Sequence, residues 1–276
     1  YLSRGQQAAV AGDTNAAAVY LAAALREGAK GSALAIPLGS VLRTIQSEKK
    51  TYRGHDGKVW ALLTLPDSKH FASAGDDGTV NLWHIDQDKP RHSWHDAKAG
   101  IFNLEVSRDG RYLVAPSYDG HARVYDLEQG KLKFDLNASE GSLWSAHFAN
   151  GGQDIIVLAM DGTASLWRLA SGELLWRFVA SPAEAGNPAI SKNGSMFIVP
   201  AFDGNVYVWD LMRRKQVKLI KNAHRSQAWT ASLSPDEKLV AIGAWDTNIS
   251  VWDTTSWRQT AFLVGHSAGL ERVAWS

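Results

Sequence analysis

The sequence predicts an all-β fold built from a repeated unit and preceded by a short α-helical segment. Five aspartates recur at spacings of 42, 42, 42 and 43 residues, and each precedes an aromatic residue by six positions. The pairs are Asp77 with Trp83, Asp119 with Tyr125, Asp161 with Trp167, Asp203 with Trp209 and Asp246 with Trp252. A strand-rich unit with this period is typical of a β-propeller, in which neighbouring units must stack because none buries its faces alone.

Each repeat carries the pattern of an antiparallel sheet. A short apolar run precedes each aspartate, as in residues 112–115 and 155–158, and is typical of a buried strand. Four of the five aspartates are followed by Gly, which supplies the positive φ of a tight hairpin turn, whereas the fifth is followed by Thr247. An alternating strand comes next, and residues 174–179 and 217–220 are typical of a fourth strand.

The composition limits the classes of partner. Among 276 residues, 29 Lys and Arg balance 28 Asp and Glu, so the net charge of +1 gives no reason to expect nucleic acid or an anionic membrane. The chain has no Cys, which excludes disulfides and thiolate metal sites and fits a reducing compartment. No apolar run has the length of a membrane span. We therefore expect a cytoplasmic protein without a cofactor; the sequence does not indicate whether it binds a small molecule.

The repeats resemble WD repeats, whose signature joins a Gly-His dipeptide to a Trp-Asp dipeptide. The resemblance covers about residues 51–276 and implies a WD-repeat β-propeller. Two units end differently, with Trp83-His84 and Trp167-Arg168. The dipeptides that fit are Gly54-His55 and Gly265-His266 at the start of units, and Tyr125-Asp126, Trp209-Asp210 and Trp252-Asp253 at the end.

The resemblance also implies a buried hydrogen-bonded network in each unit, formed by a His, a strand Ser or Thr, the turn Asp and the Trp. The first unit has the full set, and the fifth keeps three members but has Ile242 at the hydroxyl position. Units two to four have Ala115, Val157 and Val199 there and no aligned His, so we expect them to depend more on apolar packing. The structural residues so assigned are His55, Ser73, Asp77, Trp83, Asp119, Asp161, Asp203, His224, Asp246 and Trp252.

The end of the sequence matches the first strand of a repeat, because residues 273–276 align with residues 231–234. We therefore expect five complete blades plus the first strand of a sixth, truncated from a longer ring. Seven blades are the family's commonest form, and closure of the ring by oligomerisation is the alternative. Since Tyr1 is not a start Met, we also expect sequence upstream.

We assign residues 1–48 to a helical segment and residues 49–276 to the propeller. Asp13 or Thr14 is placed to cap a helix that runs to about Glu27, and a further helix from Ser32 must accommodate Pro37. The helix pair resembles tetratricopeptide-type helices. Such helices occur in bacterial multidomain signalling proteins, between a kinase or nucleotide-driven switch and a WD-repeat propeller. The apolar stripe of the first helix comprises Ala17, Tyr20, Leu21, Ala24 and Leu25.

The sequence indicates no catalytic, metal or nucleotide site. His55, Ser73 and Asp77 have the residue types of a nucleophilic triad, but the repeat already gives each of them a structural role. The nine His lack metal-ligand spacing, and there is no phosphate-binding Gly motif. The basic residues from Arg213 to Lys221 are suited to binding phosphate or an acidic protein, or to forming a charged edge strand. We favour the edge strand.

The predicted partner-binding residues occupy two columns of the repeat. One column directly precedes the turn aspartate and the other lies near the start of the first strand; in WD-repeat propellers both lie on the top face, around the channel mouth. The columns read Asp76, Tyr118, Met160, Phe202 and Trp245, and Trp60, Phe102, Trp144, Gly186, Trp229 and Glu271. We expect Lys58, Ser142, Glu184 and Gln227 to form a polar rim.

Aromatic residues and Met are enriched in interfaces, so this ring predicts a face that binds a protein or peptide, although packing between blades is the alternative for any single residue. We therefore predict a non-enzymatic interaction scaffold. The alternative is a regulatory or sensor domain of a larger bacterial signalling enzyme whose catalytic part lies upstream.

Overall fold

The computed structural model describes residues 1–11, 13–29, 34, 37 and 50–275. Its contacts divide the chain into two compact units, Tyr1–Arg53 and Gly54–Ser276. The boundary predicted between residues 48 and 49 lies outside the described residues, so it stays a prediction. No helix within these ranges is long and apolar enough to cross a membrane.

The first unit contains helices α1 (Leu2–Val10) and α2 (Thr14–Arg26). The prediction for α2 is confirmed at its start, where the Asp13 carboxylate accepts a hydrogen bond from the Ala16 amide at 3.0 Å. Of the predicted stripe, Ala17, Leu21 and Ala24 are buried. Leu25 is 53% exposed, because it lies about 100° around the helix from Ala24. Ser32, the predicted start of a further helix, lies outside the described residues.

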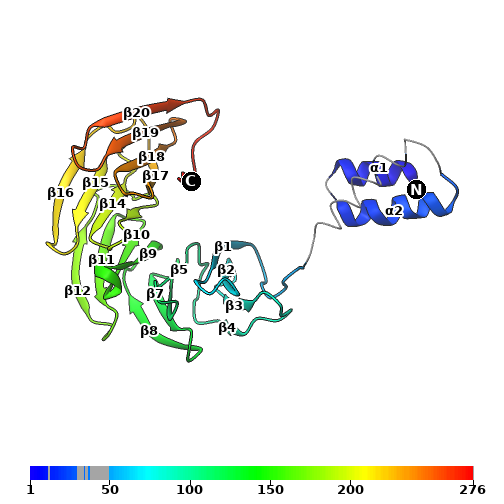
Figure 1. Ribbon diagram of the computed structural model, residues 1–276, viewed down its shortest axis with the longest axis horizontal. Helices are drawn as coiled ribbons and strands as arrows, with labels where there is room; N and C mark the ends of the chain where they lie inside the picture. Colours follow the sequence, from blue (N-terminus) through cyan, green and yellow to red (C-terminus); the bar gives the residue numbers. More distant parts are fainter. Residues whose placement is uncertain (12, 30–33, 35–36, 38–49, 276) are drawn as a thin grey trace. The chain divides into compact units, whose positions relative to one another are not determined.

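The second unit consists of five four-stranded antiparallel sheets, each formed by four consecutive strands. The sheets follow one another in an arc, with their first strands on the inner side and their fourth strands on the outer side (Figure 1). This is the predicted arrangement of propeller blades. The sheets comprise β1 (Val59–Thr64), β2 (His70–Gly75), β3 (Val80–His84) and β4 (His92–Trp94); β5 (Glu105–Val106), β6 (Tyr112–Pro116), β7 (His121–Asp126) and β8 (Lys131–Asn137); β9 (Leu143–Ala149), β10 (Asp154–Ala159), β11 (Thr163–Arg168) and β12 (Leu174–Val179); β13 (Ala189–Ile190), β14 (Met196–Pro200), β15 (Val206–Asp210) and β16 (Lys215–Ile220); and β17 (Ala228–Leu233), β18 (Leu239–Ala244), β19 (Asn248–Asp253) and β20 (Gln259–Val264).

Four apolar clusters fill the four spaces between successive sheets. In β6, Leu113 and Ala115 pack toward the first sheet while Val114, between them, packs toward the third. This alternation explains why the second strand of each blade is continuously apolar, since both of its faces are buried. The basic strand β16 is the outermost strand of its sheet, as the edge-strand interpretation predicts.

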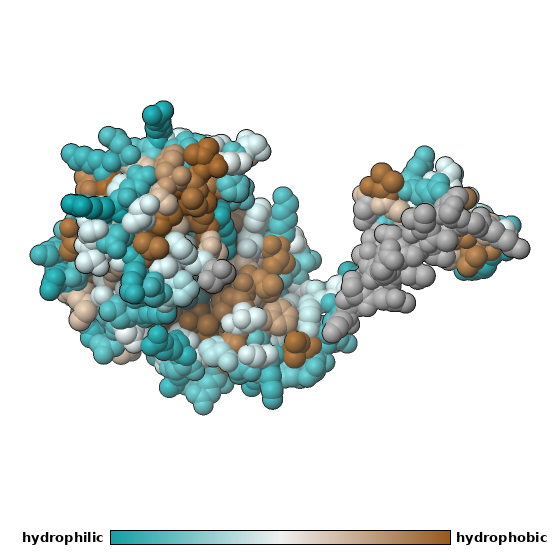
Figure 2. Space-filling model, turned by 45° about the horizontal axis from the view of Figure 1, so that its top comes forward, coloured by the Kyte–Doolittle hydropathy of each residue, from teal (hydrophilic) through white to brown (hydrophobic). Residues whose placement is uncertain are grey.

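The surface of the second unit combines apolar patches with hydrophilic side chains (Figure 2). Exposed apolar residues lie on the first and last strands, at Val59 and Leu62 in β1 and at Phe262, Leu263 and Val264 in β20.

The hairpin turns after the turn aspartates adopt the predicted left-handed backbone. Gly120 has a φ of 86°, and a Cβ there would lie 2.2 Å from the Ser139 carbonyl oxygen, so the position requires glycine. Thr247 takes the same conformation with a φ of 69°, which costs about 1 kcal/mol for a residue with a Cβ.

In the first blade, four side chains form a continuous chain of hydrogen bonds. Asp77 pairs with Nδ1 of His55 at 3.1 Å, and Nε2 of His55 lies 2.7 Å from the Ser73 hydroxyl. The Trp83 indole donates to the same hydroxyl at 2.8 Å. Because Ser73 is buried and already holds the indole, its hydroxyl is not available as a nucleophile.

The fifth blade has an equivalent network with the hydroxyl on the neighbouring strand. His224 pairs with Asp246 at 3.1 Å, its Nε2 lies 2.8 Å from the Ser250 hydroxyl, and the Trp252 indole donates to Ser250 at 2.9 Å. Ser250 is the direct cross-strand partner of Ile242. The expectation that this blade lacks the hydroxyl is therefore wrong, because Ser250 on the neighbouring strand supplies it.

The expectation that blades two to four depend more on apolar packing stays a prediction, but two of their turn aspartates do have polar side-chain partners. Asp119 forms an ion pair with the buried guanidinium of Arg123 at 2.9 Å, and the Tyr207 hydroxyl donates to Asp203 at 2.7 Å. In the third blade, the hydrogen bonds found for Asp161 among the described residues come only from Thr163 in its own turn. Arg123 and Tyr207 lie on the third strand of their blades, four residues after the turn aspartate, whereas Thr163 lies two residues after it.

We predict that Asp77→Ala destabilises the fold more than Asp161→Ala. Removing Asp77 leaves the His55 ring and the amides of Asp56 and Thr79 without their acceptor, which should cost about 2 kcal/mol. Asp161 is exposed and bonds only within its turn, so its removal should cost under about 1 kcal/mol. Urea unfolding of both variants measures the difference, and equal losses would contradict the network interpretation.

We also predict that the fold loses stability in acid through these carboxylates. Burial opposes the ionisation of Asp77, but hydrogen bonds from the Thr79 and Asp56 amides and from His55 hold its pKa below the ordinary value of 3.8. Burial likewise opposes ionisation of Asp119, whose pKa the hydrogen bonds from Arg123 and two backbone amides lower overall. A lowered folded-state pKa means that the unfolded chain takes up the proton first, so the stabilisation is present above about pH 4 and disappears below it.

The variant Asp77→Asn tests this prediction, because its amide keeps an acceptor oxygen but cannot be protonated. It should be less stable than the unaltered chain at pH 7 and should lose less stability between about pH 5 and pH 2. Denaturant unfolding across this range gives both values. Parallel pH profiles for the two proteins would exclude Asp77 as a source of acid sensitivity.

Candidate functional site

The predicted site lies at the end of the sheets that carries the five turn aspartates, which we call the top face. The segments that join one sheet to the next lie at the same end, because four antiparallel strands return the chain to the side from which it started. One backbone hydrogen bond recurs in every blade: the residue before the turn aspartate donates to a carbonyl at the start of the blade. The pairs are Asp76 to Lys58, Tyr118 to Gly100, Met160 to Ser142, Phe202 to Glu184 and Trp245 to Gln227, at 2.8–3.0 Å.

The strand-start column of the prediction coincides with β-bulges. In β1, Val59 pairs with Gly75 and Ala61 with Ala74, so Trp60 is the extra residue between them. Trp144 and Trp229 occupy the same place in the third and fifth blades. A bulge leaves its residue outside the regular ladder and redirects its side chain. The three indoles are therefore presented by a distortion that the repeat builds into its innermost strand.

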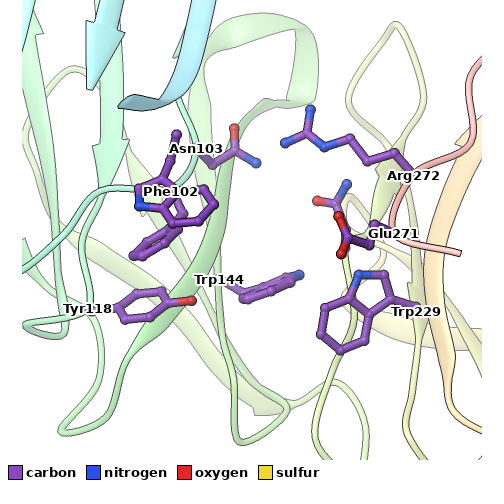
Figure 3. A pocket seen from close by; sticks show the side chains of 9 residues that line it. Phe102, Asn103, Tyr118, Trp144, Trp229, Glu271 and Arg272 are labelled. Atoms are coloured by element: carbon purple, nitrogen blue, oxygen red, sulfur yellow. The ribbon is translucent and has the colours of Figure 1, made fainter. Parts of the chain in front are cut away.

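The side chains at these positions enclose a hollow of about 520 Å³ on the top face (Figure 3). Every one of the five blades contributes at least one side chain, and the segment after β20 contributes two more. Of the eight aromatic residues and Met in the predicted columns, five line it, namely Trp60, Phe102, Tyr118, Trp144 and Trp229, together with Asn103, Asn187, Glu271 and Arg272.

The aromatic rings form two groups. In the first, Phe102 lies between Trp60 and Tyr118, with ring centroids 5.2 and 4.2 Å away. In the second, Trp229 lies at the centre, perpendicular to Trp144 at 5.4 Å and stacked on Phe202 at 5.1 Å. Trp245 completes the second group, 5.5 Å from Trp229. Phe202 and Trp245 thus support the lining residue Trp229 without lining the hollow themselves.

Three positions of the predicted columns, Asp76, Met160 and Gly186, contribute neither a ring nor lining. Met160 is half-buried and lies outside the hollow. At Gly186, a Cβ would lie 2.2 Å from the Trp229 carbonyl oxygen, so no larger residue fits there. The crowding arises because the Asn187 amide donates to that carbonyl at 2.7 Å, which joins the inner segments of the fourth and fifth blades.

Three lining residues, Asn103, Asn187 and Arg272, do not belong to the predicted columns. Each is the residue directly after the strand-start column, where the other blades have Ala61, Ser145 and Thr230. The signal that could have found them is therefore the next position of the same repeat, where long polar side chains alternate with small ones.

Polar groups surround the rings. The Trp60 indole donates to Asp76, and the Lys58 ammonium lies 5.5 Å from the centre of the Trp60 ring. Burial raises the pKa of Tyr118, so its hydroxyl is neutral at physiological pH. The other predicted rim residues, Ser142, Glu184 and Gln227, do not line the hollow. In the part of the chain that the structure describes, no group of three or more His, Asp or Glu side chains could hold a metal ion.

Comparison with protein families identifies the repeats. A family profile described as "WD40: WD domain, G-beta repeat" matches residues 46–84, 88–126 and 215–253. These matches contain the first, second and fifth of the turn aspartates and the Trp or Tyr that follow them.

Curated relatives match over single segments of about 60 residues. The chain is 39% identical over 61 residues to "Eukaryotic translation initiation factor 3 subunit I" of Phaeosphaeria nodorum, which covers 22% of this chain and 18% of the relative. It is 33% identical over 60 residues to "DDB1- and CUL4-associated factor 13" of Dictyostelium discoideum, covering 22% of this chain and 13% of the relative. A subunit I of Neurospora crassa matches at 35% over 60 residues, with 22% and 17% covered.

The matched segments thus span less than a fifth of each relative's length. The family matches nevertheless fall on the repeats that the structure folds into four-stranded sheets. The chain therefore carries WD repeats, and its five four-stranded antiparallel sheets are consistent with a WD-repeat β-propeller preceded by a short helical segment.

Proposed function

We propose that the top face binds a protein or peptide and that the chain acts as a non-enzymatic interaction scaffold. The observation that carries the proposal is the convergence of aromatic side chains from four different blades on one hollow. Trp, Tyr and Phe supply large contact areas and are enriched at the energetic centres of interfaces.

Exposure of the aromatic side chains supports the proposal. Trp60 and Trp245 are 46% and 52% exposed, which is an unusually large exposed fraction for side chains of this size. Packing accounts for Phe102, which lies between two rings, and for Phe202, which stacks on Trp229, but it leaves much of the Trp60 and Trp245 indoles in contact with water. A partner surface that covered them would recover that burial.

The names of the relatives agree with this function at a general level. One relative is named as a subunit of an initiation factor and another as a factor associated with other proteins, so each is described by its assembly with partners. The alternative, a regulatory domain of a larger signalling enzyme, stays a prediction, as do the cytoplasmic location and the tetratricopeptide-like nature of the first unit.

The double variant Trp60→Ala/Trp245→Ala tests the proposal. We expect it to lose capture of the proteins that the unaltered chain retains from a lysate of the source organism, as measured by quantitative mass spectrometry. Because both indoles are about half exposed, the melting temperature should change by only a few degrees.

The matched control is Ile85→Ala/Met212→Ala, which removes two exposed apolar side chains from the opposite end of the sheets. This variant should retain the same proteins as the unaltered chain. Capture that survives the top-face substitutions and is lost with the control pair would place the interaction on the other face.

A further inference from the structure

We infer that the hollow receives the cationic side chain of an arginine or lysine, held between Trp144, Trp229 and the Glu271 carboxylate. This inference rests on the proposed function, because it specifies the chemistry of the partner at the same face. It follows from the arrangement of the rings, the position of the charges inside the hollow and the charge of the surrounding loops.

The rings of Trp144 and Trp229 form a corner. Their planes are 82° apart and their centroids 5.4 Å apart, so the two indoles make adjoining walls of one side of the hollow. Indole is the side chain whose face attracts cations most strongly, because of its quadrupole. The protein already uses this attraction at Trp60, where the Lys58 ammonium lies 5.5 Å from the ring centre.

The two charged residues of the hollow belong to different sides of it. Arg272 also lines an adjoining hollow, together with Trp60, Phe102 and Asn103, and Glu271 does not. Figure 3 agrees, since the guanidinium of Arg272 extends toward Asn103 while Glu271 lies by Trp229. The carboxylate is therefore the charged group of the indole corner, and it is exposed.

The surrounding loops favour a cation as well. The turns and inter-sheet segments of the top face carry eight exposed Asp or Glu and five exposed Lys or Arg. The loops at the opposite end of the sheets carry seven exposed Asp or Glu and ten exposed Lys or Arg. The almost neutral chain thus separates its charge between its two faces, with an excess of negative charge around the hollow. Such a field attracts basic segments of a partner and repels acidic ones.

The experiment uses the full chain and four acetylated, amidated tripeptides, Gly-X-Gly, with X as Arg, Lys, Gln or Glu. Binding is followed through the indole N–H signals in NMR spectra of the nitrogen-15-labelled protein. Trp144→Phe and Trp229→Phe assign the two signals of the corner. We expect the Arg and Lys peptides to shift both signals and the Gln and Glu peptides to leave them in place.

Two charge variants give opposite results under the proposal. Glu271→Gln should weaken binding of the Arg peptide about fivefold, which corresponds to about 1 kcal/mol. Arg272→Gln should leave the affinity unchanged or increase it, because it removes a like charge. Both residues are exposed, so neither substitution should alter the fold.

Two outcomes overturn the inference. One is the absence of any shift of the corner signals at 20 mM Arg or Lys peptide, and the other is tighter binding of the Glu peptide that Arg272→Gln abolishes. Either result leaves the proposed function standing if Trp60→Ala/Trp245→Ala still loses its partner while Glu271→Gln retains it. The experiments therefore distinguish failure of this inference from failure of the proposed function.

Discussion

Burial of apolar side chains between successive sheets is the interaction on which the rest of this structure depends. Each of the three middle sheets contributes apolar side chains to two of the four clusters, and the first and fifth sheets contribute to one each. This requirement fixes the spacing between sheets, and the spacing brings the first strands together along the inner side of the arc. The aromatic hollow exists because five separate strands are held side by side in this way.

The polar networks connect residues within individual blades of this framework. Their partners could be predicted from the sequence only in part. The period, the turn glycines and the continuously apolar second strands predicted the sheets, since each depends on near neighbours in the chain. The partners of the turn aspartates depend on pairing across strands instead. Ser250 and Arg123 share one position of the repeat, four residues after the turn aspartate, but differ in chemistry. A search for the family's hydroxyl on the preceding strand therefore overlooks both of them.

The candidate site could likewise be predicted from the sequence only in part. The repeat identified the two columns that supply its rings, because the same positions recur with the period, three of them as bulges in the first, third and fifth blades. It did not identify Asn187 or Arg272, since their inclusion depends on how neighbouring blades approach each other. Gly186 illustrates the limit: its small size follows from the Trp229 carbonyl of the next blade, which no pattern within its own repeat reveals.

The bulges have a consequence for how such a surface changes during evolution. A residue in a regular strand is constrained by its ladder partners and by the apolar layer on its face. The extra residue of a bulge lies outside the ladder, so exchanging Trp60, Trp144 or Trp229 changes the lining of the hollow while the pairing of Val59 with Gly75 and its counterparts persists. Under the proposed function, recognition and folding are encoded in different residues of the same strand, and selection can act on one of them without sacrificing the other.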